Sequence, residues 1–223
     1  QVVEIEVPES WKDAEDEGLF TPEVKGGRED VVDFVKNIQA KVNAQEGNSL
    51  PVSAFTEYVD GTTPSGSSAY EKRGIAVDIP VWQPENCIQC NRCAYVCPHA
   101  VIRPVALTEE EVANAPEGLE TIDMVGMPGL KFTMTVSAYD CTGCGSCANV
   151  CPGKKGEKAL VMKNMEENAG KQDFFDYGRE IPVKPEVVAK FKETTVKGSQ
   201  FKQPLLEFSG ACAGCGAVSY THL

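Results

Sequence analysis

Eight of the ten cysteines fall into two runs with the same spacing, C-x2-C-x2-C-x3-C-P. The first run is Cys87, Cys90, Cys93 and Cys97 before Pro98, and the second is Cys141, Cys144, Cys147 and Cys151 before Pro152. Bacterial ferredoxins use this spacing to bind two [4Fe–4S] clusters through soft thiolate ligands. The sequence therefore predicts two clusters that transfer electrons at low potential.

The fourth cysteine of each run is expected to bind the cluster of the other run. Three cysteines at intervals of three can wrap three corners of a cube, but the fourth cannot fold back onto the same cube. We therefore assign one cluster to Cys87, Cys90, Cys93 and Cys151, and the other to Cys141, Cys144, Cys147 and Cys97. Zinc ribbons use separated C-x2-C pairs, and disulfides would pair cysteines this clustered in many ways, so neither alternative suits the spacing.

The last two cysteines, Cys212 and Cys215, form a lone C-x2-C pair. By itself such a pair is a dithiol, half of a zinc site or half of an iron–sulfur site. The pair and the first residue, Gln1, together predict that the chain is a piece of a longer protein. We expect no catalytic residues, because no Ser–His–Asp set, carboxylate pair or phosphate-binding glycine loop is evident.

We expect a β-strand shortly before each cysteine run. Apolar residues alternate with polar ones over 75–81 and over 130–136, and a period of two predicts a strand in each case. Pro80 favours an edge position for the first strand. Thr108 and Glu111 form a capping box that predicts a short helix among the 43 residues between the runs. We expect this insertion to cover a cluster or to dock a neighbouring domain.

The flanking regions carry further patterns. Apolar spacing predicts a strand at residues 3–7 and a helix at residues 31–42, with Asp30 as the N-cap of the helix. Residues 50–68 are rich in Gly, Pro, Ser and Thr and are expected to form a linker. The polar stretch 164–203 is expected to be a connector that contains a short helix at Pro185–Phe191.

The composition excludes two classes of partner. The chain has 33 acidic and 21 basic side chains, a net charge of −12 and no basic stripe, so nucleic acid would be repelled. No stretch approaches the roughly 20 apolar residues of a membrane span, so we expect no membrane partner. The absence of a signal peptide favours a reducing, cytoplasmic compartment, where clustered cysteines bind metal or do redox chemistry.

The chain resembles pyruvate:ferredoxin (flavodoxin) oxidoreductase, or pyruvate synthase, in its single-chain form. The similarity lies in residues 50–55, residues 70–76, Trp82, the two cysteine runs and residues 208–216. It departs from the family pattern at Ala217. The resemblance implies that Cys212 and Cys215 hold half of a third [4Fe–4S] site.

The resemblance also implies a domain organisation. Residues 1–25 are then the tail of a preceding domain, 26–65 a small linker-like domain, 66–182 the ferredoxin-type domain, and 183–223 the start of a thiamine-diphosphate-binding domain. The expected fold is α+β, a bacterial-type 2[4Fe–4S] ferredoxin-like domain with an insertion, flanked by partial neighbouring domains.

The implied function is that of an electron-transfer segment. The family converts pyruvate and coenzyme A to acetyl-CoA and CO2, and passes electrons from thiamine diphosphate through [4Fe–4S] clusters to ferredoxin or flavodoxin. Thiamine diphosphate, Mg and coenzyme A belong to the full-length enzyme, which we expect to be a homodimer. Two alternatives stay open: a free-standing ferredoxin-like carrier and an interaction module held by structural metal.

Overall fold

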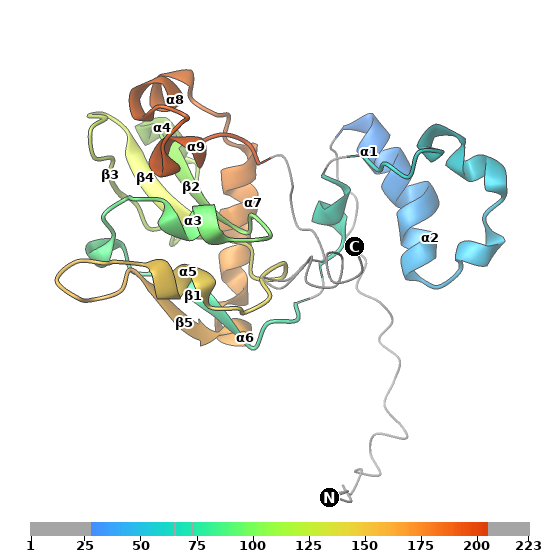
Figure 1. Cartoon of the computed structure of the whole chain (residues 1–223), viewed down its shortest axis with the longest axis horizontal. Helices are drawn as coiled ribbons and strands as arrows, with labels where there is room; N and C mark the ends of the chain where they lie inside the picture. Colours follow the sequence, from blue (N-terminus) through green and yellow to red (C-terminus); the bar gives the residue numbers. More distant parts are fainter. Residues whose placement is uncertain (1–27, 65, 73, 205–223) are drawn as a thin grey trace, which may run out of the picture. The chain divides into compact units, whose positions relative to one another are not determined.

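The computed structural model describes residues 28–64, 66–72 and 74–204, which form two compact units divided between Glu71 and Lys72 (Figure 1). The strand expected at residues 3–7 and the Cys212–Cys215 pair lie outside the described residues. The domain boundaries stay predictions. No helix in the described ranges is long and apolar enough to cross a membrane.

The first unit is built on one helical segment. It consists of α1 (Glu29–Phe34), a π-helical turn (Val35–Gln39) and α2 (Ala40–Asn43), which confirms the helix expected at 31–42. The expected cap is wrong, because Arg28 is the N-cap and Asp30 lies in the first turn. The Asp30 carboxylate instead accepts hydrogen bonds from the Arg28 guanidinium at 2.8 and 2.9 Å.

The segment expected to be a linker folds back onto this helix. A 3-10 turn at Gly47–Ser49 precedes it, a second at Val52–Tyr58 lies within it, and a third at Ser67–Tyr70 begins at its end. Leu50, Tyr58 and Tyr70 pack against the buried face of the helix, and the Tyr58 ring meets Phe34 edge-on at 5.0 Å between centroids. These apolar side chains give the first unit a small hydrophobic core of its own.

The second unit contains two small antiparallel sheets. In one, β1 (Asp78–Trp82) pairs with β5 (Leu160–Asn164); in the other, the order is β2 (Ile102–Leu107), β4 (Lys131–Val136), β3 (Ile122–Asp123). Pro80 lies in a strand with one neighbour, as predicted. The strand begins at Asp78 instead of Ile75, and both Ile75 and Val77 are exposed before it.

The strand expected at 130–136 is confirmed as β4, and it is buried on both faces. Phe132, Met134 and Val136 face the core, while Thr133 and Thr135 are also buried. Helix α7 (Gln172–Glu180) covers the threonine side. A Cβ on Gly178 of α7 would lie 3.1 Å from Val105 and 3.3 Å from Thr135, so the glycine permits the close approach.

The helix expected at Pro185–Phe191 is confirmed as α8, but the rest of 164–203 is not the expected connector. It forms α6 (Met165–Asn168), a 3-10 turn (Ala169–Lys171), α7, α8 (Pro185–Phe191) and α9 (Val196–Ser199). Phe175, Val187 and Phe201 are buried against the sheets and the cysteine loops. Few apolar residues are present, and these three large ones are buried in the core.

The predicted capping box is confirmed in helix α4 (Glu109–Ala113). The Thr108 hydroxyl accepts from the Glu111 N–H at 3.2 Å, and the Glu111 carboxylate accepts from the Thr108 N–H at 2.7 Å. Lys184 adds two 2.8 Å hydrogen bonds to the same carboxylate. Burial alone would raise the pKa of Glu111, but these contacts outweigh it and hold the pKa below its usual range.

We expect Glu111→Ala to lower the free energy of unfolding by about 2 kcal/mol, because it removes half of a capping box and a carboxylate that pairs with a mostly buried lysine. Urea unfolding followed by circular dichroism measures the change. The matched control is Glu110→Ala, which removes an exposed carboxylate from the same helix and is expected to change stability by less than about 0.5 kcal/mol. Equal losses in the two variants would contradict the prediction.

Candidate iron–sulfur sites

The two cysteine runs adopt the same local structure. In each, the first two cysteines lie in a loop, the third lies on a short helix and the fourth is the C-cap residue of that helix. The helices are α3 (Arg92–Val96) and α5 (Ser146–Val150), which lie side by side in Figure 1. A strand precedes each loop, so the internal repeat expected from the sequence is present in the fold.

Both loops turn through two residues with left-handed backbone. In the second loop these are Gly143 and Gly145, with φ of 70° and 72°; in the first they are Gln89 and Asn91, with φ of 56° and 59°. The turn points a backbone N–H at the first cysteine of each run. Gly143 N lies 3.4 Å from the Cys141 sulfur, and Gln89 N lies 3.4 Å from the sulfur of the first cysteine.

Two hollows separate the loops, and each is lined by cysteines of both runs. The first, of about 330 Å³, is lined by Cys87, Cys90, Cys93 and Cys151. The second, of about 350 Å³, is lined by Cys97, Cys141, Cys144 and Cys147. Each hollow thus has three cysteines of one run and the fourth cysteine of the other.

Apolar side chains complete the walls of both hollows. Trp82, Ile88, Met134 and Leu160 line the first, and Pro80, Val101, Ile102 and Met162 line the second. Met134 and Ile102 come from the strands between the two runs, so this segment covers the hollows on one side. Such walls limit the access of water and lower the local dielectric constant.

The donor chemistry suits a soft metal cluster. All eight cysteines are free thiols, and burial raises the pKa of Cys141 to about 11 and that of Cys147 to about 12. Binding metal must therefore displace their protons. Within the described part of the chain, no three His, Cys, Asp or Glu side chains converge closely enough to hold a single metal ion. The thiols instead stand apart, around the hollows.

Buried polar groups also line the hollows. They are the indole N–H of Trp82, which is directed at the Cys87 sulfur, and the unpaired amide oxygen of Asn91 in the first, and the hydroxyl of Thr142, which is directed at the Cys144 sulfur, in the second. The indole N–H and the hydroxyl can donate to an acceptor placed in each hollow, as the sulfides of an iron–sulfur cluster would be. The residues present therefore fit such a group.

The sequence reasoning missed two residues that hold the first loop in place. Gln89 is buried; its amide donates to the Asp123 carbonyl at 2.7 Å and accepts from the Val125 N–H at 2.9 Å. Asn91 is also buried and donates to the Lys197 carbonyl at 2.9 Å. A comparison of the two cysteine runs could have found them. Gln89 and Asn91 occupy the positions that are Gly143 and Gly145 in the second run.

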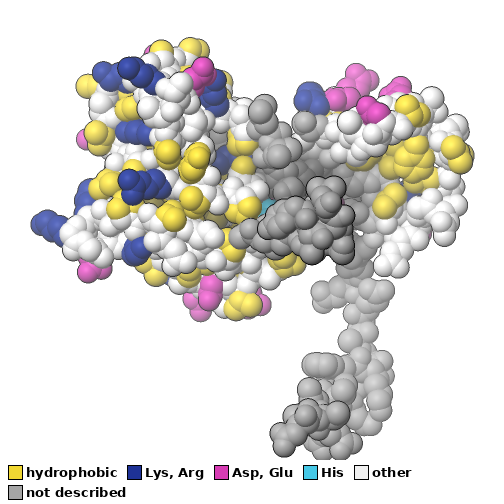
Figure 2. Space-filling view, viewed as in Figure 1, with side chains coloured by type: hydrophobic (Ala, Val, Ile, Leu, Met, Phe, Trp, Pro, Cys, Tyr) yellow, Lys and Arg dark blue, Asp and Glu magenta, His cyan; other side chains and the backbone are white. Residues whose placement is uncertain are grey.

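The negative charge of the chain is unevenly divided along the sequence. Residues 1–71 have 15 acidic and 5 basic side chains, whereas residues 72–204 have 17 acidic and 16 basic ones. Figure 2 shows Lys and Arg scattered among hydrophobic side chains on the second unit, and Asp and Glu gathered on one part of the first. The unit that contains the cysteine loops is thus nearly neutral.

Comparison with known proteins matches two parts of the chain to protein families. Residues 86–156 match a family described as a 4Fe-4S dicluster domain, and residues 22–76 match the EKR family, described as a domain of unknown function. The chain is 48% identical over 222 residues to the pyruvate-flavodoxin oxidoreductase of Enterobacter agglomerans, an alignment that covers 100% of this chain and 18% of that protein.

Two further relatives extend this result. The chain is 50% identical over 223 residues to the pyruvate:ferredoxin oxidoreductase of Moorella thermoacetica, with 99% of this chain and 18% of that protein covered. It is 46% identical over 198 residues to a pyruvate dehydrogenase (NADP(+)) of Cryptosporidium parvum, with 87% and 10% covered. The chain thus spans about a fifth, or less, of the length of these relatives. It corresponds to one segment of the pyruvate:ferredoxin (flavodoxin) oxidoreductase family, and its residues 86–156 are a 4Fe-4S dicluster domain.

Proposed function

We propose that the two hollows hold two [4Fe–4S] clusters with crossed ligands. The first cluster is bound by Cys87, Cys90, Cys93 and Cys151, and the second by Cys141, Cys144, Cys147 and Cys97. The observation that carries this proposal is the lining of each hollow, which combines three cysteines of one run with the fourth of the other. The crossing ligands fix the two sites close together, since each short helix contributes to both.

We further propose that the chain relays electrons within a pyruvate oxidoreductase. When bound, [4Fe–4S] clusters accept and donate single electrons at low potential. The protein contributes thiolates, backbone N–H groups directed at sulfur, and apolar walls that exclude water. The residues of this chain bind the clusters that transfer the electrons, and the reaction of pyruvate is assigned to other parts of the full-length protein.

The family similarity supports the remaining features of the proposal. We propose that Cys212 and Cys215 bind half of a third [4Fe–4S] site, and that thiamine diphosphate, Mg and coenzyme A bind elsewhere in the full-length protein. Ferredoxin or flavodoxin, named in the relatives, is the proposed electron acceptor. The full-length protein is proposed to be a cytoplasmic homodimer with an α+β ferredoxin-like domain that contains an insertion.

The test is metal analysis of protein purified without oxygen. The two sites contribute about eight irons and eight acid-labile sulfides per chain, beyond any in the rest of the protein. Reduction with dithionite is expected to produce low-temperature EPR signals of reduced [4Fe–4S] clusters. A colourless protein with stoichiometric zinc in these sites would overturn the proposal.

A further inference from the structure

A lysine from the end of the second unit is bonded to the first cysteine loop. Lys197 lies on α9, and its backbone carbonyl accepts the 2.9 Å hydrogen bond from the Asn91 side chain. Asn91 is 1% exposed and stands between Cys90 and Cys93. The position of Lys197 is therefore coupled to the loop that supplies three ligands of the proposed first cluster.

The backbone around Lys197 has little freedom to move. The Thr195 hydroxyl accepts from the Gly198 N–H at 3.0 Å and lies 2.7 Å from the Phe191 carbonyl, to which it can donate. A Cβ on Gly198 would lie only 2.1 Å from the Lys192 carbonyl oxygen, so the two backbone segments are in close contact. Close packing and a capped turn hold α9 in one place.

The side chain of Lys197 is half-buried, and its helix α9 packs against α3. Its ammonium lies 4.0 Å from the centre of the Phe191 ring, and Phe191 stacks on buried Phe201 at 5.7 Å between centroids. Because its carbonyl is bonded to Asn91, which lines the first hollow, the charge of Lys197 is held close to the first cysteine loop. Burial lowers the pKa of Lys197, whereas attraction to Cys87 and Cys90 in their charged form acts in the opposite direction.

The charged residues beside the second hollow are arranged differently. Asp140 directly precedes Cys141, and its negative charge raises the pKa of that thiol, an effect smaller than that of burial. The Asp140 carboxylate is paired with the Lys72 ammonium in a mostly buried ion pair. These two opposite charges largely cancel, so this ion pair adds little net charge beside the second site.

We propose that the Lys197 ammonium raises the reduction potential of the first cluster. This inference rests on the proposed cluster sites. Reduction is a single-electron step: the first cluster gains one electron, the donor (dithionite in the titration) loses it, and no bond is formed or broken. The electron adds one negative charge at the first site, and a nearby cation stabilises that charge.

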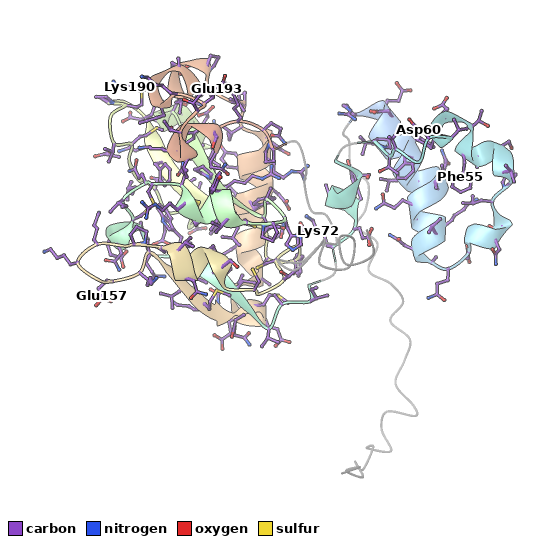
Figure 3. The ribbon with its side chains drawn as sticks, in the orientation of Figure 1. Phe55, Asp60, Lys72, Glu157, Lys190 and Glu193 are labelled. Carbon is purple, nitrogen blue, oxygen red and sulfur yellow. The ribbon has the colours of Figure 1, made fainter. Side chains whose placement is uncertain are left out.

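The experiment is a redox titration of the full-length protein followed by EPR. Lys197→Met keeps an unbranched apolar side chain but removes the charge. We expect it to lower the equilibrium constant for reduction of the first cluster about tenfold. For one electron this equals a decrease of 59 mV in the reduction potential. Lys197→Arg is expected to retain the unmutated potential. The signal of the first cluster is identified by its loss in Cys90→Ala. The matched control, Lys190→Met, removes an exposed lysine from α8 (Figure 3).

Four outcomes would overturn the inference. The first is an unchanged potential in Lys197→Met, and the second is a shift confined to the second cluster. The third is an equal shift in Lys190→Met. The fourth is loss of the first cluster in Lys197→Met with retention in Lys197→Arg, because the lysine would then hold the site together without setting its potential. Iron content and EPR of the unmutated protein are read first, since their failure would reject the cluster sites themselves.

Discussion

Replacing Cys97 and Cys144 together with alanine is expected to remove one cluster, or about four irons per chain. Replacing Cys97 and Cys90 together is expected to remove both clusters, or about eight irons. The two double variants each lack two thiols, and they differ only in which hollow the second thiol lines. Iron and sulfide analysis of anaerobically purified proteins gives the counts relative to the unmutated protein.

The single variants are the controls for this comparison. Cys97→Ala and Cys144→Ala are each expected to remove the same cluster, so their EPR spectra after reduction should match. Cys151→Ala and Cys90→Ala are expected to form the other matching pair. If each cluster were held by one run alone, the iron losses of the two double variants would be reversed. That reversal would contradict the crossed ligand sets.

The cysteine pattern allowed the ligand sets to be predicted because ligand spacing is a local property of the sequence. Two residues between successive thiols set the curvature of the loop, whatever the rest of the fold does. The contacts of Gln89, Asn91 and Lys197 could not be found this way. They join residues 36 and 106 positions apart in the chain, and such contacts depend on how the helices and strands pack.

The errors in the fold prediction have a similar cause. The polarity of residues 164–203 suggested a connector, but a helix needs only a narrow apolar stripe to pack, and Phe175 with Gly178 supplies it in α7. In the same way, the alternation of β4 identified the strand but did not show that α7 would bury Thr133 and Thr135. Local periodicity identifies an element but cannot show which of its faces a distant segment will bury.

Asp140→Asn is expected to lower the free energy of unfolding of the second unit by about 3 kcal/mol, because it leaves the Lys72 charge in a buried position without its carboxylate. The side chains of Lys72 and Asp140 are 8% and 5% exposed. The carboxylate also accepts a 2.6 Å hydrogen bond from Ser137, which is fully buried. Thermal unfolding of the holoprotein is expected to show a decrease of about 10 °C for this unit.

The matched control is Asp123→Asn, which breaks an exposed ion pair with Lys131 in the same unit. Asp123 is 90% exposed there, so its loss is expected to cost less than about 1 kcal/mol. Adding Lys72→Met to Asp140→Asn removes the buried charge and is expected to restore most of the lost stability. If Lys72→Met lowered the stability of Asp140→Asn by as much as it lowers that of the unmutated protein, the two side chains would be energetically independent. The ion pair beside Cys141 would then not be what stabilises the second cysteine loop.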